Sequence, residues 1–462
     1  MKYFIQCFCC LLVAMYSAVP LLKAQAKAEP NILIIYVDDL GYGDLSCYGG
    51  DIPTPQIDRI AEQGIRFTEF YVSAPACTPS RFSVLTGAYP QRSRHGLTNA
   101  LMPVDTNYLD DAEMTLAKYA KAYNYRTGIF GKWHLGFKNK SDSPEQHGFD
   151  KFSGLKGGCI DFFTHVYGQM GHDWFVNSVQ TRERGYSTEL ITNHTLSFID
   201  DCRKVNQPFF TFLSYNAPHY GKTDPDSVVA HTVSLSEGEY HGYGIINSLQ
   251  APPKYIEKFA EIEDPYRQAY AAMVSCLDDN IGRLLDHLEQ SGMMEHTIIW
   301  FISDNGGYSI RYFGHADNGG LRGEKGTIYE GGIKVPSLLQ WKGYLDAGQV
   351  REGPVCNIDV LPTLLNLTGM RLNRNNTPKI DGVDLTNFLL ENEQISRPLF
   401  WYYNQQMAIR DGKWKLVNGE ELFNMDQDPF ESKNLASDHP KVKQRLSIKY
   451  EQMAEELDIM LR

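Results

Sequence analysis

The chain has 462 residues, of which 42% are hydrophobic and 22% charged, and its formal net charge is −12. This length exceeds what a single hydrophobic core normally serves, so we expect one large domain and one smaller one. The acidic balance argues against a nucleic-acid partner, because nucleic-acid-binding proteins carry a basic surface.

Residues 1–26 have the pattern of a secretory signal peptide. Lys2 precedes a mostly apolar run, and Ala24-Gln25-Ala26 supplies a small-residue cleavage site. The alternative is an N-terminal membrane anchor, but the run contains polar residues and a proline and is short for a stable span. We therefore predict export without a stable membrane anchor, to the periplasm or the medium, or to the lysosome or extracellular space in a eukaryote.

Short apolar runs alternate with amphipathic stretches over the first three quarters of the chain. Strands are expected at 32–37, 126–130, 209–214 and 297–302, and helices at 114–123, 188–200 and 266–288. This alternation predicts an α/β fold with a large, mixed but mostly parallel sheet flanked by helices. Residues 154–185 are rich in glycine, aromatic residues and histidine, and we expect a long surface loop there.

After about residue 350 the pattern changes to short strand candidates at 399–401, 407–410, 414–417 and 421–423. The pairs Asp411-Gly412 and Asn418-Gly419 are hairpin turn signals, and a helix is expected at 441–461. We therefore expect residues 27–350 to form the main domain. Residues 351–462 are expected to form a smaller subdomain with an antiparallel sheet and a helix.

Cys77 begins the run Cys-Thr-Pro-Ser-Arg, which Phe-Ser-Val-Leu-Thr-Gly follows. A lone cysteine is most often a buried apolar side chain or half of a disulfide. Here prolines bracket the thiol, Ser80 is a candidate cap for a helix that begins at Arg81, and Gly87 is a candidate end for that helix. Just before a helix, the helix dipole would favour negative charge on residue 77.

This segment resembles the signature of the type I, formylglycine-dependent sulfatases of the alkaline phosphatase superfamily, which are arylsulfatase-like enzymes. The matching residues are Cys77, Pro79, Ser80, Arg81, Leu85, Thr86 and Gly87. The resemblance implies that a maturation enzyme converts Cys77 to formylglycine (3-oxoalanine), whose aldehyde hydrates to a geminal diol. One hydroxyl of the diol would attack the sulfur of a sulfate ester, and the other would lose its proton as the aldehyde reforms and sulfate leaves.

Acidic and amide side chains follow two of the expected strands, as Asp38-Asp39 and Asp304-Asn305. Taken singly, such a pair is more often a solvated loop or a helix cap. In an open parallel sheet, however, ligands bind beyond the carboxyl ends of the strands, and hard oxygen donors suit calcium or magnesium rather than zinc. The resemblance to sulfatases implies one Ca²⁺ ion held by Asp38, Asp39, Asp304, Asn305 and the modified Cys77.

Basic side chains follow the other expected strands. Lys132 and His134 are two apart in the run Gly-Lys-Trp-His-Leu-Gly, so in an extended segment they share a face. The resemblance implies that Lys132 binds the sulfate and that His134 orients the formylglycine. It also makes His219 a candidate general acid and Lys325 a contact of the sulfate and the leaving oxygen. Arg81 and the two lysines would then be the local cations of the site.

Residues that would recognise the rest of the substrate are harder to assign. Candidates are His172, Asp173 and Trp174 in the long loop and Arg311 and His315 after the Asp304-Asn305 pair, each with a structural role as an equal alternative. Our hypothesis is an exo-acting sulfatase that acts on sulfated galactose or N-acetylgalactosamine of glycosaminoglycans, mucins or similar glycans.

Other functions stay open from the sequence. One is an arylsulfatase; another is a phosphate or phosphonate ester hydrolase of the same superfamily, although the chain lacks the extra Asp-His clusters expected for a second metal. A third is an inactive carbohydrate-binding homologue, for which broken catalytic motifs would be expected, whereas every motif here is intact.

Overall fold

The computed structural model describes residues 29–177, 179–309, 315–371 and 379–460. The signal peptide expected at residues 1–26 lies outside this part of the chain. Within the described residues, no helix has the length and apolar character needed to span a membrane.

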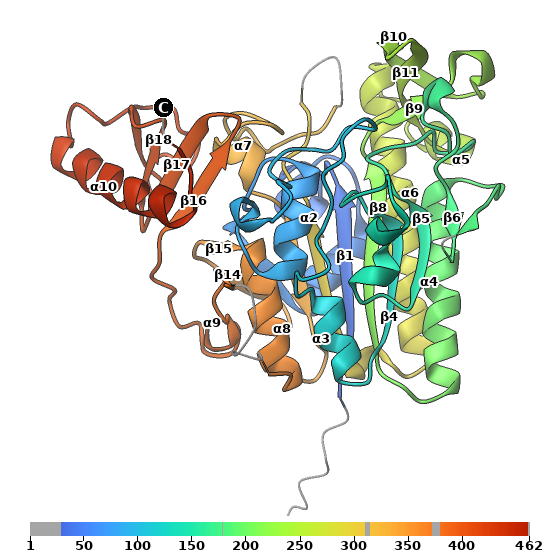
Figure 1. Ribbon diagram of the computed structural model, residues 1–462, viewed down its shortest axis with the longest axis horizontal. Coiled ribbons are helices and arrows are strands. Elements are labelled where there is room, and N and C mark those ends of the chain that lie inside the picture. The colour runs from blue at the N-terminus through green and yellow to red at the C-terminus, as the bar shows by residue number, and fades with distance from the viewer. Residues whose placement is uncertain (1–28, 178, 310–314, 372–378, 461–462) are drawn as a thin grey trace, which may run out of the picture.

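A ten-stranded sheet forms the centre of the molecule (Figure 1). The central neighbours pair in parallel, and antiparallel pairs flank them on both sides. The expected mixed, mostly parallel sheet is therefore confirmed. Its strands in spatial order are β14 (Gln349–Arg351), β2 (Ile65–Phe67), β13 (Ser337–Gln340), β12 (Thr297–Ser303), β1 (Asn31–Asp38), β8 (Phe209–Pro218), β4 (Arg126–Lys132), β5 (Lys151–Leu155), β6 (Phe175–Val176) and β7 (Val179–Gln180).

Helices cover both faces of this sheet. Successive side chains of a strand point to opposite faces, so Ile34 and Leu33 of β1 enter two different cores. Because both cores are apolar, β1 is a continuous apolar run rather than an alternating one. The Ile34 side is covered by α2 (Cys77–Thr86), α3 (Leu116–Ala122) and α8 (Val360–Thr368), and the Leu33 side by α1 (Pro55–Glu62), α4 (Ser187–Lys204) and α6 (Pro265–Gln290).

Smaller elements surround the central layers. An antiparallel sheet of three strands directly follows β8 in the chain and lies near the top of Figure 1. The remaining elements of this part are β3 (Phe70–Tyr71) paired with β15 (Val355–Cys356), the three strands β9 (Gly221–Thr223), β10 (Thr232–Tyr240) and β11 (Tyr243–Gln250), and the helices α5 (Pro253–Lys258), α7 (Glu330–Ile333) and α9 (Thr386–Glu391).

The C-terminal part is a four-stranded antiparallel sheet with one helix, as the sequence predicts. Both positions of the Asn418-Gly419 pair have positive φ, which explains the choice of residues at this turn. The elements are β16 (Leu399–Tyr403), β17 (Gln406–Asp411), β18 (Trp414–Val417), β19 (Glu421–Asn424) and α10 (Pro440–Glu456).

The polypeptide between the two sheets packs on the large one. Phe388 of α9 stacks on Phe67 of β2 with ring centroids 6.4 Å apart, and Leu361 of α8 lies against Gly87 at the end of α2. Residues 355–391 therefore lie with the large sheet, although the sequence pattern placed them in the smaller subdomain. The small sheet begins only at Leu399.

A buried ion-pair network joins the small sheet to the large part. Lys415 Nζ lies 2.8 Å from Glu330 Oε1 and 2.7 Å from Glu431 Oε1, and all three side chains are fully buried. Nearby, Gln406 Nε2 donates to the carbonyl oxygen of Gly326 at 2.9 Å. These contacts fasten the segment that carries Lys325 to the C-terminal sheet.

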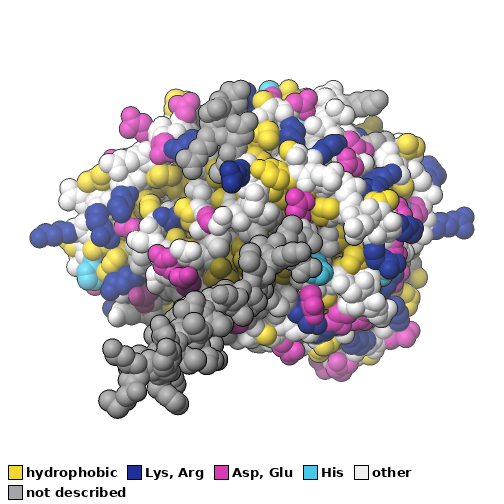
Figure 2. Space-filling view, turned by 90° about the horizontal axis from the view of Figure 1, so that it is seen from below, with side chains coloured by type: hydrophobic (Ala, Val, Ile, Leu, Met, Phe, Trp, Pro, Cys, Tyr) yellow, Lys and Arg dark blue, Asp and Glu magenta, His cyan; other side chains and the backbone are white. Residues whose placement is uncertain are grey.

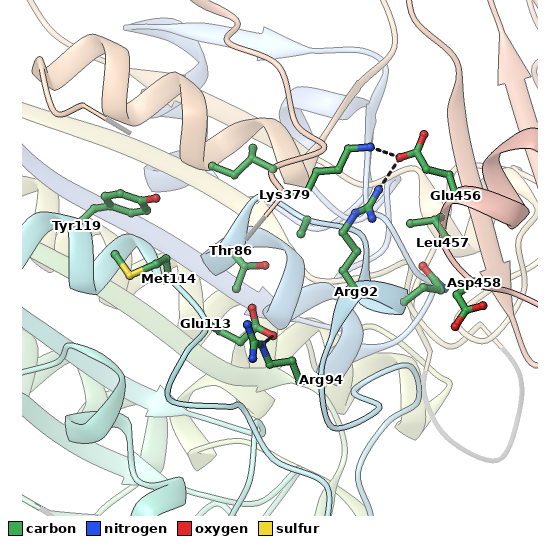
Figure 3. A pocket seen from close by; sticks show the side chains of 13 residues that line it. Thr86, Arg92, Arg94, Glu113, Met114, Tyr119, Lys379, Glu456, Leu457 and Asp458 are labelled. Carbon is green, nitrogen blue, oxygen red and sulfur yellow. Dashed lines mark hydrogen bonds and ion pairs between the residues drawn. The ribbon is translucent and has the colours of Figure 1, made fainter. Parts of the chain in front are cut away.

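The surface at the amino ends of the central strands carries interspersed acidic and basic side chains (Figure 2). Next to the C-terminal helix lies a cavity of about 320 Å³. There Arg92 and Lys379 both bind Glu456 near the end of α10, with 2.6 Å between Arg92 Nη2 and Glu456 Oε1 (Figure 3). These two ion pairs are a second attachment between the C-terminal subdomain and the large part of the molecule.

Two local expectations are wrong. Helix α2 begins at Cys77 with Ala76 as its N-cap, so Ser80 lies inside the helix and does not cap it; its hydroxyl instead bonds to that of Tyr36. The helix starts early because Pro79 is tolerated in a first turn, and it ends at Gly87 as expected. The second concerns residues 154–185, which include β6 and β7 and bury the side chains of Trp174 and His165, because aromatic residues pack rather than face water.

Candidate active site

The carboxyl ends of four neighbouring strands and the start of α2 meet at one place above the sheet. Strands β1, β12, β4 and β8 end in or beside Asp38, Asp304, Lys132 and His219. Cys77 is the first residue of α2 and is only 3% exposed. The parallel arrangement therefore gathers side chains that are far apart in sequence.

Three buried carboxylates are paired with three buried cations. Lys132 Nζ lies 2.7 Å from Asp38 Oδ2, and Lys325 Nζ lies 2.5 Å from Asp39 Oδ1. The third pair joins Arg81 Nη2 and Asp304 Oδ2 at 2.9 Å. An ion buried without a partner costs several kcal/mol, so these pairs hold one another in place.

Arg81 is fully buried and connects three strands. Besides Asp304, its guanidinium group donates to the carbonyl oxygen of Lys132 at 3.2 Å and to the hydroxyl of Ser214. Its planar fork lies over the ring of Tyr36, with 5.4 Å between Cζ and the ring centroid. Because it bonds to groups on β4, β8 and the end of β12, Arg81 sets the spacing of the strand ends.

The pKa values of the carboxyl groups diverge. Burial opposes ionisation of Asp38, but Lys132, together with His219 and Arg81, lowers its pKa well below the usual range. Burial and the neighbouring Asp38 raise the pKa of Asp304 instead. Such divergence is typical of functional sites, where charge is concentrated away from water.

Several oxygen atoms at the site fit a hard cation. Asp38 Oδ1 and Asn305 Oδ1 are buried and have no hydrogen-bond partner among the described residues. Ligand atoms of Asp38, Asp39 and His219 lie within 4.8 Å of one another. Carboxylate and amide oxygens are the donors that Ca²⁺ prefers, so the residues present fit a calcium ion.

Cys77 is in contact with His134. The distance from Cys77 Sγ to His134 Nδ1 is 3.2 Å, and His134 Nε2 donates to the carbonyl oxygen of Leu101 at 2.8 Å. Burial, reinforced by Lys132, lowers the pKa of His134 well below its usual value, so the ring is neutral. With its proton on Nε2, the imidazole turns a basic Nδ1 toward residue 77.

The backbone is strained where it presents these side chains. His134 has φ of 56° and Asp39 has φ of 64°, both in the left-handed region that non-glycine residues seldom adopt. Each such residue costs of order 1–3 kcal/mol, which the surrounding packing must offset. Trp133 supplies part of that packing, because its buried indole donates to the carbonyl oxygen of Asp142 at 2.8 Å.

His219 faces the carboxylates from the end of β8. Its Nδ1 donates to the carbonyl oxygen of Tyr220 at 2.8 Å, which leaves Nε2 toward the site, 3.4 Å from Asp39 Oδ2. Burial lowers its pKa to about 4, and Asp39 opposes that shift. Nε2 is thus the nitrogen that can exchange a proton with a group bound here.

The candidate substrate residues are not all brought together. His172 and Asp173 line a cavity of about 250 Å³, while Trp174 is fully buried and donates to Glu183, so it offers no face to a sugar. His315 packs on Tyr266 of α6, with rings 5.0 Å apart. Arg311 lies outside the described residues.

Some contacts in and next to the site were not anticipated. Ser80 is held by both Tyr36 and Asn357, whose side-chain amide donates to the Ser80 hydroxyl at 3.0 Å. Lys222 follows His219 closely and lies over the ring of Tyr220. Ser214 of β8, which bonds to Arg81, was also not anticipated. Its position as a polar residue inside an apolar strand run was a signal that could have identified it.

Comparisons with known proteins agree with this geometry. Residues 30–370 match the sulfatase family, and residues 323–457 match the C-terminal region of N-sulphoglucosamine sulphohydrolase. N-acetylgalactosamine-6-sulfatase of Rattus norvegicus is 30% identical over 429 residues, covering 88% of this chain and 74% of its own length. Arylsulfatase A of Homo sapiens is 30% identical over 423 residues, with 84% and 74% covered.

Solved structures are similar over nearly the whole chain. The crystal structure of Ps i-CgsB has a TM-score of 0.81 at 28% identity, with 92% of this chain and 93% of that chain covered. The same protein has been solved in complex with k-i-k-neocarrahexaose.

The packing around Trp133, which supports the backbone at His134, should become less stable at low pH. His147 is buried against Trp133, with ring centroids 5.6 Å apart, and burial lowers its pKa to about 4. The unfolded state binds a proton near pH 6.5 and the folded state only near 4. Stability should therefore fall as pH drops through this window, by about 3 kcal/mol from this residue.

Urea unfolding of His147→Phe between pH 7 and pH 4 measures this effect. The variant keeps an aromatic ring but cannot titrate, so its stability should fall less steeply than that of the parent. Replacing the exposed His296 by Phe is the control and should leave the slope unchanged. Equal slopes for His147→Phe and the parent would contradict the assignment.

Proposed function

Because the chain belongs to the sulfatase family, we propose that it hydrolyses sulfate esters of carbohydrates through an aldehyde hydrate formed at Cys77. The protein is a sulfuric ester hydrolase of the alkaline phosphatase superfamily. The observation that carries the proposal is the contact between Cys77 Sγ and the unprotonated Nδ1 of His134. Formylglycine at this position supplies a hydroxyl nucleophile together with a second hydroxyl that allows sulfate to be released.

The residues around Cys77 have distinct proposed roles. His134 Nδ1 accepts a proton from a hydroxyl on residue 77, because its other nitrogen is committed to Leu101. Lys132 and Lys325 bind sulfate oxygens, and Arg81 holds the strand ends that position them. His219 Nε2 donates a proton to the leaving alcohol, and the adjacent Asp39 carboxylate offsets part of the lowering of the His219 pKa by burial.

We assign a calcium ion to Asp38, Asp39, Asp304 and Asn305, with residue 77 beside them. The fit of the donor set supports this assignment, in particular the two oxygens without hydrogen-bond partners. Calcium would supply positive charge that polarises a sulfate oxygen. Three carboxylates and three cations already balance at the site, so a divalent ion gives a local surplus of positive charge.

The proposed substrate is a sulfated galactose or N-acetylgalactosamine at the end of a glycan. Support comes from the N-acetylgalactosamine-6-sulfatase relatives and from the neighbour solved with k-i-k-neocarrahexaose. His172 and Asp173 on the cavity wall are the proposed sugar contacts. We also propose export through the signal peptide at residues 1–26, and maturation of Cys77 by a formylglycine-generating enzyme.

Mass spectrometry of the peptide that contains Cys77 tests the reaction. In protein expressed with a competent modifying enzyme, residue 77 should lose sulfur and two hydrogens and gain one oxygen. Turnover of a sulfated sugar should scale with the modified fraction, and Cys77→Ala should have none. Turnover by protein whose Cys77 stays a thiol would refute the mechanism, as would faster hydrolysis of the matching phosphate ester.

The role of His219 can be tested with leaving groups of different acidity. His219→Gln should lose about 10²–10⁴-fold in kcat on a sugar sulfate, because the departing alkoxide needs a proton. On 4-nitrophenyl sulfate, whose phenolate leaves unaided, the loss should be less than about tenfold. His296→Gln, at an exposed position, is the control. Equal losses on both substrates would argue against general acid catalysis by His219.

Calcium removal should lower thermal stability. Protein treated with EDTA should melt at a lower temperature, and Ca²⁺ at about 100 times its Kd should restore about 2.7 kcal/mol. Asn305→Leu removes an unpartnered oxygen and should lose most of this response in differential scanning calorimetry. Asn366→Leu, at an exposed position, should keep it. If the melting temperature of the parent protein did not depend on Ca²⁺, the assignment would be wrong.

A further inference from the structure

Lys222 lies close to the candidate general acid. The ring of His219 packs on that of Tyr220 with centroids 4.2 Å apart, and Lys222 Nζ lies 5.0 Å from the centroid of Tyr220. These three side chains form a continuous row from the end of β8 into β9. The leaving group of a substrate would occupy the same side of the site, because it must reach His219.

The ammonium group of Lys222 is partly buried without a counter-ion. Among the described residues, its one hydrogen bond is donated to the side-chain oxygen of Asn247, at 2.5 Å across the β9–β11 pair. Within the described part of the chain, no carboxylate lies within 4.0 Å of Lys222 Nζ. Burial lowers its pKa, and a cation in this position would be stabilised by an added anion.

A cavity adjoins this row of side chains. Lys222 Nζ also lies 5.6 Å from the ring centroid of Tyr167, which lines the 250 Å³ cavity together with Phe137, Phe175 and His172. Aromatic walls with a few polar groups are typical of ligand pockets. Lys156, on the same wall, lies over the ring of Phe175 at 4.7 Å and adds a second positive charge.

The wall of this cavity is shared with the reaction site. The backbone nitrogen of His134 donates to the carbonyl oxygen of Lys156 at 3.0 Å, and Gly158 lies directly against the His134 ring. A side chain at position 158 would meet that ring at 2.8 Å, so glycine keeps the wall thin. The cavity and the reaction site are therefore direct neighbours, on either side of this short segment.

We propose that Lys222 binds a second acidic group of the substrate, a sulfate or a carboxylate on the sugar next to the one that loses its sulfate. This inference rests on the proposed function and adds to it that the enzyme prefers glycans with neighbouring acidic groups. The chain as a whole has a net charge of −12, which repels such substrates. Local cations outside the sulfate pocket offset that repulsion where the neighbouring sugar binds.

Binding to a catalytically inert protein tests the subsite independently of turnover. In a Cys77→Ala background, calorimetry would compare three disaccharides in which sulfated N-acetylgalactosamine is joined to galactose, to sulfated galactose or to a uronic acid. The parent should bind at least one acidic disaccharide more tightly than the neutral one. Lys222→Met should weaken that binding about 10- to 100-fold, the worth of one charge-assisted hydrogen bond, and leave the neutral ligand within about twofold.

Two further variants complete the experiment. Lys222→Arg keeps the positive charge and should retain the preference, which separates charge from folding. Lys254→Met removes an exposed lysine that also lies over a tyrosine ring, 4.6 Å from Tyr255, and should change nothing. The comparison of the sulfated with the uronic ligand identifies which acidic group is recognised.

The proposal would be overturned if Lys222→Met bound all three ligands like the parent, or weakened all three equally. With modified Cys77, Lys222→Met should also hydrolyse 4-nitrophenyl sulfate within about twofold of the parent, because this substrate lacks a second acidic group; a larger loss would count against the subsite. If the parent hydrolysed no sulfate ester at all, the proposed function would fail, while the binding data would still decide the role of Lys222.

Discussion

The structure depends on the mutual neutralisation of six charges buried at the carboxyl edge of the large sheet. Asp38, Asp39 and Asp304 are opposed by Lys132, Lys325 and Arg81, and each pair joins segments distant in sequence. Removing any one partner would leave an uncompensated buried charge, which costs about 3–5 kcal/mol. The strand order that sets β1 between β12 and β8 is therefore also the order that makes these charges tolerable.

The same balance of charges makes the site suitable for an anion. The ion pairs satisfy most hydrogen-bond donors and acceptors, but Asp38 Oδ1 and Asn305 Oδ1 have no hydrogen-bond partner among the described residues. Burial lowers the pKa of both His134 and His219, and each commits one ring nitrogen to a backbone carbonyl. Each imidazole consequently presents one defined nitrogen to the reaction centre. A neutral cluster that gains a divalent cation becomes positive, which suits an anionic ester in an otherwise acidic protein.

Much of the fold and of the site could be predicted from the sequence, because each motif directly follows an apolar run. The run at 32–37 forms β1, which ends in Asp38, and the run at 297–302 forms β12, which Asp304 follows. The expectations that were wrong concern residues whose positions depend on tertiary contacts. Ser80 looked like a helix cap, yet its hydroxyl meets Tyr36, and Trp174 looked like a sugar platform, yet it packs inside.

Charge pairs that join the small sheet to the large part of the molecule could not be predicted for the same reason. Nothing local to Lys415 in β18 indicates that it meets Glu330 of α7, since the two lie 85 residues apart. Lys222 was overlooked because its significance comes from the rings around it and from the lack of a carboxylate, neither of which is visible in a single strand of three residues.

The burial of Cys77 also limits the time at which it can be modified. Cys77 is 3% exposed, and Ser80 and Arg81 are fully buried, so no other enzyme can bind this segment once the sheet has formed. Closure requires β12, which leaves the ribosome roughly 220 residues after Cys77; at about 5–20 residues per second this leaves roughly 10 to 45 s. The proposed conversion of Cys77 would have to be finished in that interval, or in a chain that is kept open afterwards. The speed of folding would then set the fraction of molecules that carry the modified residue.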